Sequence, residues 1–328
     1  MAEYAKPWLS VDEQIDRLAG HGITIEDRGR ATSLLEATGY YRLTGYLYPF
    51  RESETWIDSE HNVRTRVLSR YRAGTRLEHA EEIIDFDRRL RMLVMDGVER
   101  IEVAIRMRIG YVLGRRSPFA YEDPDSFIEA FTTERTDARE PAPSRQVQWL
   151  QRINNRKASS DEQFVEHFRA KYDDRMPVWA LTEILELGHL SILYRGMHQQ
   201  DAEEIALAFG VPTKKIMTSW LASLNYVRNV AAHHSRLFNR KLQHAPARPK
   251  AGQIPALDHL REEQTAKGVF GTYNALAVIA YLLPSIVPGT DWPNRLATLL
   301  SEFPSSHALT TTSMGAPSDW ESLELWRG

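Results

Sequence analysis

Apolar residues recur along most of the chain at the spacing of amphipathic helices, and no series of segments alternates as β-strands do. The clearest case runs from about His79 to Leu113, where one stripe of a helical wheel is apolar, as in a helix that faces a core. The pattern therefore predicts an all-α fold with a long central helix. The residues of this stripe are Ile83, Leu90, Val94, Gly97, Val98, Ile101, Ile105 and Val112.

Capping and breaking residues predict the other helices. Ser10 and Glu13 have the spacing of a capping box, so a short helix is expected from Ser10 to about Ala19. The aromatic segment 40–50 leaves helix and strand open, because short apolar runs do not distinguish them. Further helices are expected from near Glu26 to about Gly39, from about Asp161, from Pro177 through Leu193, from about Thr213 to Leu242, and once or twice within 257–287.

These elements indicate three regions along the chain. Residues 1–78 are expected to form an N-terminal helical region. Residues 79–243 are expected to form a helical core, which includes a polar surface loop at about 132–160 with at most a short helix in it. Residues 244–328 begin with a proline-rich linker and continue into C-terminal helices that pack on the core.

A second line of side chains, mostly charged, follows the long helix about a third of a turn from the apolar stripe. Charges of both signs at i, i+3 and i+4 spacing are typical of a solvated salt-bridge ladder, and they can also orient a neighbouring site. Both interpretations stay open. The line consists of Arg88, Met95, Glu99, Glu102 and Arg106.

The segment from Arg64 to Arg76 is a secondary candidate for contact with nucleic acid. It places five arginines around Tyr71, and arginines beside an aromatic ring can bind phosphates and stack on a base. An ordinary solvated loop or helix face is the favoured interpretation.

Composition limits the classes of function. The formal net charge is -3, which excludes a strongly basic surface, so any contact with RNA must be local. Cysteine is absent, which excludes disulfides, thiolate metal sites and a cysteine nucleophile and suits a cytoplasmic protein. No secretory signal is visible at the start, and the longest apolar run, Ala275 to Val287, is too short to span a bilayer.

The candidate chemistry lies in the stretch Arg-Asn-Val-Ala-Ala-His-His, which begins at Arg228. On the helix expected from about Thr213 to Leu242, one polar stripe contains Asn229, His233, Arg236 and Arg240. His234 then falls beside the apolar face and is expected to be a core histidine that supports the motif.

RNA can be cleaved without a metal ion, because its own 2′-hydroxyl can attack the adjacent phosphate. Histidine can serve as the base that removes the proton or as the acid that protonates the leaving oxygen, and His233 is the candidate. Arg228, with Arg236, would stabilise the negative charge of the transition state, and Asn229 would position the imidazole or the phosphate. One histidine supplies half of an acid–base pair, so a two-fold homodimer is expected to supply the other half.

Metal hydrolysis is disfavoured, because neighbouring histidines on a helix project about 100° apart and no His-Glu-x-x-His spacing occurs. The chain also has no Gly-rich phosphate loop and no Gly-x-Ser-x-Gly elbow. No metal and no cofactor is therefore expected.

Several distant blocks, in order, resemble the abortive-infection (Abi-like, AbiD/AbiF) family of phage-defence proteins over nearly the full length. Several blocks together are more specific than a single short motif. The blocks are Tyr40-Tyr41-Arg42-Leu43 with Tyr46, Phe86 to Arg91, Pro177-Val178-Trp179 with Glu183 and Gly188, Arg228 to Arg240, and Met314 to Pro317 with Asp319 and Trp320.

The family is similar to the HEPN superfamily of helical bundles, and this resemblance has further implications. It implies a multi-helix HEPN-type bundle with N-terminal and C-terminal helical additions. The Arg-x4-His motif of HEPN nucleases maps onto Arg228, Asn229 and His233 of this sequence. The resemblance further implies a metal-independent dimer and a small structured non-coding RNA that restrains the protein as an antitoxin would.

Two main hypotheses follow, with RNA as the partner in both and neither DNA nor a membrane expected. One is a defence toxin that cleaves RNA as a homodimeric endoribonuclease. The other is a non-catalytic protein that holds a cognate non-coding RNA, with Arg236, Arg240, Arg42 and Arg88 as phosphate contacts. Glu102 and Arg106 would support the motif in either case. A helical interaction module is a third alternative.

Overall fold

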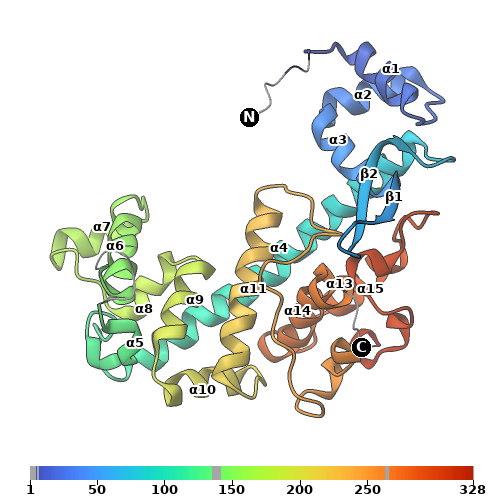
Figure 1. Ribbon diagram of the computed structural model, residues 1–328. Coiled ribbons are helices and arrows are strands. Elements are labelled where there is room, and N and C mark those ends of the chain that lie inside the picture. Colours follow the sequence, from blue (N-terminus) through green and yellow to red (C-terminus); the bar gives the residue numbers. More distant parts are fainter. Residues whose placement is uncertain (1–4, 6, 135–141, 263–265, 328) are drawn as a thin grey trace. The chain divides into compact units, whose positions relative to one another are not determined.

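Amphipathic helices form most of the chain, so the all-α expectation is confirmed, with one small two-stranded sheet added. The computed structural model (Figure 1) describes residue 5 and residues 7–134, 142–262 and 266–327. Three segments lie outside the described residues. They are 1–4, at the start where no secretory signal was expected, 135–141 in the expected loop, and 263–265 in the expected C-terminal helices.

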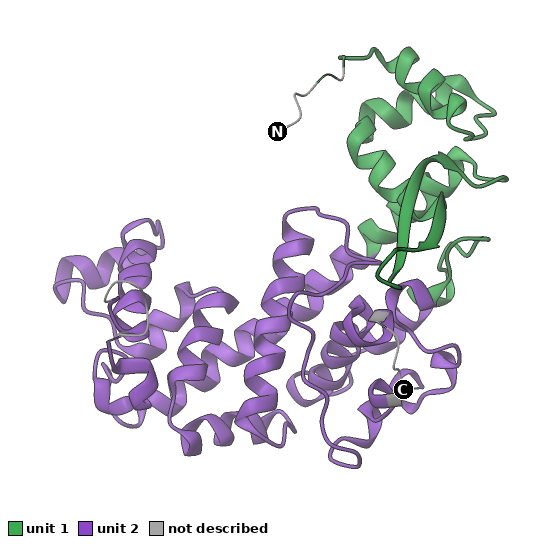
Figure 2. Cartoon of the chain, in the orientation of Figure 1, with its two compact units in different colours: residues 1–89, 299–311 green, residues 90–298, 312–328 purple. Residues whose placement is uncertain are grey.

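The chain divides into two compact units, coloured separately in Figure 2. Unit 1 comprises residues 1–89 and 299–311, and unit 2 comprises residues 90–298 and 312–328. The three regions expected from the sequence, 1–78, 79–243 and 244–328, stay a prediction, because compactness by itself does not establish where independent domains begin and end.

Unit 1 begins with short helices, and the start of the first is capped as predicted. The Ser10 side chain accepts a hydrogen bond from the Glu13 backbone, and the Glu13 carboxylate accepts one from the Ser10 backbone at 2.7 Å, which completes the capping box. The aromatic segment resolves as helix, followed by a single 3-10 turn at Tyr48–Phe50. The elements are α1 (Val11–Gly20), α2 (Arg28–Thr38), α3 (Tyr40–Leu47), β1 (Arg51–Ile57), β2 (Val63–Tyr71) and the first turns of α4 (Leu77–Gly114).

The segment from Arg64 to Arg76 contains most of a β-strand, so the expectation of a loop or helix face is wrong. β1 and β2 pair antiparallel, with Glu54 opposite Arg66 and Thr55 opposite Thr65. Opposite charges that face each other across two strands stabilise the pair. Such charges stand here where strands usually alternate apolar and polar residues, so the sequence lacks the usual signal of a strand.

Unit 2 contains the remaining helices. The apolar stripe of α4 is buried, as predicted, from Leu90 through Val112. The elements of unit 2 beside the rest of α4 are α5 (Glu129–Thr132), α6 (Arg145–Ala158), α7 (Gln163–Lys171), α8 (Val178–Leu181), α9 (Leu187–Gly196), α10 (Gln199–Ala208), α11 (Lys214–Ala232), α12 (His259–Glu262), α13 (Ala266–Phe270), α14 (Thr272–Ile286) and α15 (Trp292–Ser301), whose last three residues belong to unit 1.

Two predicted segments of unit 2 differ from the structure. The described part of the expected loop at 132–160 contains the helix α6, and its residues Trp149 and Ile153 are buried in the core. The helix expected from Pro177 through Leu193 is divided into α8, the 3-10 turn Thr182–Ile184 and α9. Pro141 and Pro143, which lie just before α6, led to the prediction of a loop there. The helix predicted from Pro177 is too long because apolar residues continue through the 3-10 turn.

A glycine allows α4 to approach two neighbouring elements of the core. A Cβ atom at Gly97 would lie 2.8 Å from Ile279 Cγ2 and 2.8 Å from Trp292 Nε1. The Trp292 indole N–H donates to the Leu93 carbonyl at 2.9 Å, so the ring cannot withdraw without losing this bond. The close packing of α4 against α14 and α15 therefore requires glycine at position 97. Among the described residues, no helix is both long enough and apolar enough to cross a membrane.

Gly97→Ala is expected to destabilise the protein by about 1–3 kcal/mol, because overpacking a core costs more than the helix propensity gained. The matched control is Gly45→Ala in α3, where the added methyl group meets nothing within 4 Å. Urea unfolding of the two variants measures the difference. A Gly97→Ala variant as stable as the Gly45→Ala variant would contradict the close packing.

Candidate functional site

Helix α11 positions the first two residues of the motif. The helix begins near Thr213, as predicted, and the Thr213 side chain caps its start by accepting from the Ile216 backbone. The buried residues Leu224 and Val227 form its inner face. α11 packs side by side with α9 (Figure 1). Arg228 and Asn229 lie in its last turns, half-buried beside this core face.

The end of α11 lies ten residues before the predicted end at Leu242. The helix stops at Ala232, and His234 adopts a left-handed backbone conformation with φ 54°. The Ser235 backbone donates to the Val230 carbonyl, and the His234 backbone to the Ala231 carbonyl, each at 3.0 Å. These two bonds form a Schellman motif, which terminates helices most often at glycine. Histidine in that position gave no sequence signal for the stop.

Because the helix ends there, wheel angles do not apply after Ala232. His234 is exposed, so the expectation of an inward-facing core histidine is wrong. Arg236 and Arg240 follow the helix rather than continue its polar stripe. Arg240 instead donates to the Tyr226 hydroxyl at 2.8 Å and lies over its ring, which attaches the following segment to α11.

A buried carboxylate connects α4 with α11. Glu102 is 7% exposed and pairs with Arg106 at 2.6 Å, while Arg228 Nε lies 4.0 Å from its other oxygen. Arg228 also donates to the Asn229 side-chain oxygen at 3.3 Å. The charged line of α4 is therefore not a solvated ladder at this point. Glu102 holds two guanidinium groups, and the cluster has an excess of positive charge.

His233 differs from these residues in its surroundings. Its ring is exposed, and within the described part of the chain it has no hydrogen-bond or ion-pair partner. The structure thus brings Arg228, Asn229, Glu102 and Arg106 together, and it does not bring the His233 ring into hydrogen-bond contact with them. The imidazole is available to a ligand from solution.

Arg106 and a residue that the sequence did not single out, Arg156, complete this region at the start of α9. Arg106 and Arg156 donate to the consecutive carbonyls of Leu185 and Ile184, at 2.9 and 3.1 Å. A Cβ at Gly188 would lie 3.2 Å from the Asn225 side-chain oxygen, so α9 approaches α11 closely there.

His189 follows Gly188 and is half-buried at the same place. Burial lowers the pKa of His189, and the neighbouring Arg152 and Arg156 lower it further, whereas Glu186 and Glu102 act in the opposite direction. Its Nδ1 accepts from the Glu186 backbone at 3.3 Å, which places it in the capping box of α9. Only a structure links this histidine to Glu102, because they are far apart in sequence.

The other arginines proposed for RNA contact belong to unit 1. Arg42 lies over the Tyr46 ring, and the Tyr46 hydroxyl donates to the buried Asp87 at 2.6 Å. Arg88 pairs with Asp85 on its own helix at 3.0 Å. Both arginines have partners within unit 1, and they are not part of the cluster around Glu102.

The arginines of β2 are largely neutralised by carboxylates. Arg64, Arg66 and Arg70 pair with Asp58, Glu54 and Glu52 at 2.6, 3.0 and 3.3 Å. The central aromatic residue, Tyr71, is buried and offers no face on which a base could stack. These pairs support the solvated interpretation of this segment over a basic patch for RNA.

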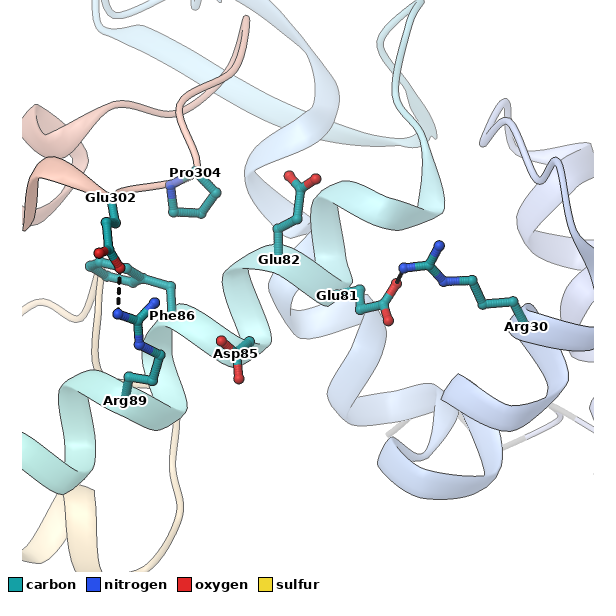
Figure 3. A pocket seen from close by; sticks show the side chains of 8 residues that line it. All are labelled: Arg30, Glu81, Glu82, Asp85, Phe86, Arg89, Glu302 and Pro304. Atoms are coloured by element: carbon teal, nitrogen blue, oxygen red, sulfur yellow. Dashed lines mark hydrogen bonds and ion pairs between the residues drawn. The ribbon is translucent and has the colours of Figure 1, made fainter. Parts of the chain in front are cut away.

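A pocket of about 470 Å³ in unit 1 has the wrong charge for phosphate (Figure 3). Two ion pairs, Arg30–Glu81 and Arg89–Glu302, neutralise its arginines, and further carboxylates remain on its wall. No group of three or more His, Asp or Glu side chains suited to a metal ion occurs among the described residues.

Comparison with known proteins identifies the class to which this helical chain belongs. The sequence model of the Abi-like protein family matches residues 33–239, more than half of the chain, and the protein is a member of this family. Membership associates it with abortive infection, a form of phage defence. The match includes α4, α9 and α11. No curated protein and no solved structure matches the chain.

Glu102→Gln is expected to lower the free energy of unfolding by about 1–3 kcal/mol, because Arg106 and Arg228 would lose a charged acceptor in a mostly buried place. Glu99→Gln, at an exposed position on the same helix, is the control and is expected to change stability by less than about 0.5 kcal/mol. Urea unfolding measures both. Equal effects would show that Glu102 is no more important than a surface carboxylate.

The lowered pKa of His189 predicts a dependence of stability on pH. At pH values between the pKa of His189 in the folded protein and its ordinary value of about 6.5, the unfolded chain binds more protons than the folded chain. The contribution of His189 to stability is therefore complete above about pH 6.5 and is lost as the pH falls below it. His189→Gln keeps a side-chain acceptor for the cap of α9 and is expected to reduce this loss. Unfolding curves at about pH 8 and about pH 5.5 measure the loss of stability in the wild type and in His189→Gln. An identical loss in the two proteins would refute the assignment of this pH dependence to His189.

Proposed function

We propose that this protein is a metal-independent endoribonuclease that acts in abortive infection, with Arg228, Asn229 and His233 at the reacting phosphate. The observation that supports this best is the exposed imidazole of His233, which has no partner in the described chain and follows a helix whose last turns present Arg228. Glu102 orients Arg228, so that a guanidinium group is held near the solvent without being fully neutralised.

In the proposed reaction, a neutral imidazole removes the proton from the 2′-hydroxyl of RNA. The 2′-oxygen attacks the adjacent phosphorus, the bond to the 5′-oxygen breaks, and a protonated imidazole returns a proton to that oxygen. The products are a 2′,3′-cyclic phosphate and a free 5′-hydroxyl. Arg228 stabilises the charge on the phosphoryl oxygens, and Asn229 orients Arg228 or the phosphate.

The reaction needs a base and an acid, whereas each chain supplies one proposed catalytic histidine, His233. A two-fold dimer supplies the second imidazole from the other copy. Mass measurement across an elution peak tests this part. If the active species is a monomer, the paired-histidine mechanism fails.

A cognate small non-coding RNA is the proposed restraint on this activity. The same arginines that stabilise a scissile phosphate can hold a structured RNA that is not cleaved, and this RNA would then occupy the site as an antitoxin. Other cellular or phage RNA is cleaved when the site is free.

A non-catalytic RNA-binding protein is the second candidate. The observation that favours it is the lack of hydrogen-bond contact between the His233 ring and Arg228 or Asn229. In that case Arg236 and Arg240 contact phosphates, and the work of the protein is to hold its non-coding RNA.

Incubation of the purified protein with bulk RNA in EDTA distinguishes the two candidates. The wild-type protein is expected to cleave RNA, and His233→Ala is expected to lose at least about 100-fold in rate, the usual contribution of a general acid or base. The control is His234→Asn, since asparagine tolerates the left-handed backbone conformation at that position. It is expected to stay within a few-fold of wild type.

No cleavage by any of the three proteins, with RNA still bound on purification, would refute the nuclease and support the RNA holder. Equal loss in both histidine variants would refute the assignment of the reaction to His233. Gel analysis of the 3′ ends for a cyclic phosphate tests the 2′-hydroxyl mechanism directly.

A further inference from the structure

An arginine-lined pocket lies between α6 and α9 in unit 2. Its volume is about 170 Å³, below the range of about 300–1,000 Å³ that is usual for sites of whole small molecules. We call it the arginine pocket and define it by its lining residues, which are Arg145, Gln148, Trp149, Arg152, Ile192 and Arg195.

The arginines of this pocket have no acidic partners. Within the described residues, no carboxylate forms an ion pair with Arg145, Arg152 or Arg195, whereas most other arginines of unit 2 that face solvent have one. Like charges brought together without a counter-ion repel each other. A bound anion would remove this repulsion, and a guanidinium group offers phosphate two parallel donors.

The start of α6 adds to the positive potential. Arg145 is the first residue of the helix, and the first turn of α6 contains no acidic residue. The amino end of a helix already has a partial positive charge, so an arginine there is unfavourable for the helix and favourable for an anion. Arg145 and Arg195 line the same pocket, and burial together with the charge of Arg145 lowers the pKa of Arg195.

The arginines continue along α6 in a single stripe. Arg145, Arg152 and Arg156 follow one another at spacings of seven and four residues, so they lie within about 20° of one line on the helix. The stripe is about 16 Å long, since the rise is about 1.5 Å per residue, and it can contact more than one phosphate. The Trp149 indole donates to the His189 carbonyl at 3.0 Å, which fixes this face of α6 to α9.

The far end of the stripe reaches the candidate site. Arg156 donates to the Ile184 carbonyl, and Arg106, the partner of Glu102, donates to the next carbonyl at Leu185. The charges of Arg152 and Arg156 lower the pKa of His189, which lies at the start of α9, and the charge of Glu102 raises it. The arginine pocket and the cluster around Glu102 thus meet at the start of α9.

We infer that the arginine pocket and the α6 stripe bind the phosphate backbone of a single-stranded RNA and lead it to Arg228 and His233. This deepens the proposed function and rests on it for the identity of the nucleic acid. Phosphate contacts position a strand without reading its sequence, so the path predicts broad rather than base-specific binding. A single strand is favoured over a duplex because a pocket of about 170 Å³ can admit part of a flexible strand and is too small to admit a double helix.

The test is a variant that replaces all three pocket arginines, Arg145→Gln, Arg152→Gln and Arg195→Gln. The probe is a fluorescent single-stranded RNA with 2′-O-methyl sugars, which cannot be cleaved through its 2′-oxygen. Its dissociation constant is measured by anisotropy over a range of salt concentrations. Affinity is expected to fall at least about tenfold at low salt. The salt slope is expected to become less steep by about 2, because each phosphate that the protein no longer neutralises reduces the slope by roughly 0.7.

The control removes the same charge elsewhere in unit 2 through Arg115→Gln, Arg175→Gln and Arg295→Gln. These arginines pair with Glu204, Glu122 and Asp96, so they are not available to phosphate. The control is expected to bind the RNA within a few-fold of wild type. Equal losses in both variants, or no loss in the pocket variant, would overturn the proposed path. Thermal unfolding checks that both variants are folded.

Cleavage separates this inference from the proposed function. At saturating cleavable RNA the pocket variant is expected to keep its rate and to require more RNA for half-saturation. A protein that cleaves nothing but loses affinity for the 2′-O-methyl RNA in the pocket variant alone refutes the nuclease and retains the path. A protein that cleaves normally with unchanged half-saturation in the pocket variant refutes the path and retains the nuclease.

Discussion

The carboxylate of Glu102 is a charge that the fold has placed out of water, and the arrangement of the site depends on how that charge is neutralised. A buried carboxylate is tolerated only with close donors. Arg106 supplies one, Arg228 approaches as a second, and Arg106 further ties the segment before α9 through the Leu185 carbonyl. One residue of α4 therefore sets the positions of the turn before α9 and of the last turns of α11.

The same constraint explains why the site keeps an excess of positive charge. A single carboxylate orients two guanidinium groups, and Arg156 and His189 stand at the same place beside α9. Electrostatic stabilisation of a phosphoryl group needs donors that are fixed before the substrate arrives. Glu102 fixes them at the cost of only one negative charge. Arg145 and Arg152 of α6, which have no ion pair among the described residues, add further positive charge on a second helix.

Prediction from sequence succeeded where an element has an apolar face or a usual cap, and it failed where the local signal is atypical or the decisive contacts are distant. The long stripe of α4 and the capping box at Ser10 were recognised because both are local patterns. The hairpin β1–β2 was missed because its pairing uses charges, and the end of α11 because His234 occupies a position where glycine is usual. Of the site, the sequence predicted a helix that contains Arg228, although it ends ten residues earlier than expected, and it predicted the charged line through Glu102. The contact between them, and the role of His189, depend on the crossing of helices that no local spacing reveals.

Both compact units are discontinuous in sequence, and this has a consequence for synthesis. Residues 299–311 complete unit 1, and residues 312–328 complete unit 2. Domains usually fold as units while the chain emerges from the ribosome, N-terminal part first. Here each unit receives its last segment only when residues 299–328 have been translated. A product that ended before residue 299 would therefore lack a part of both units.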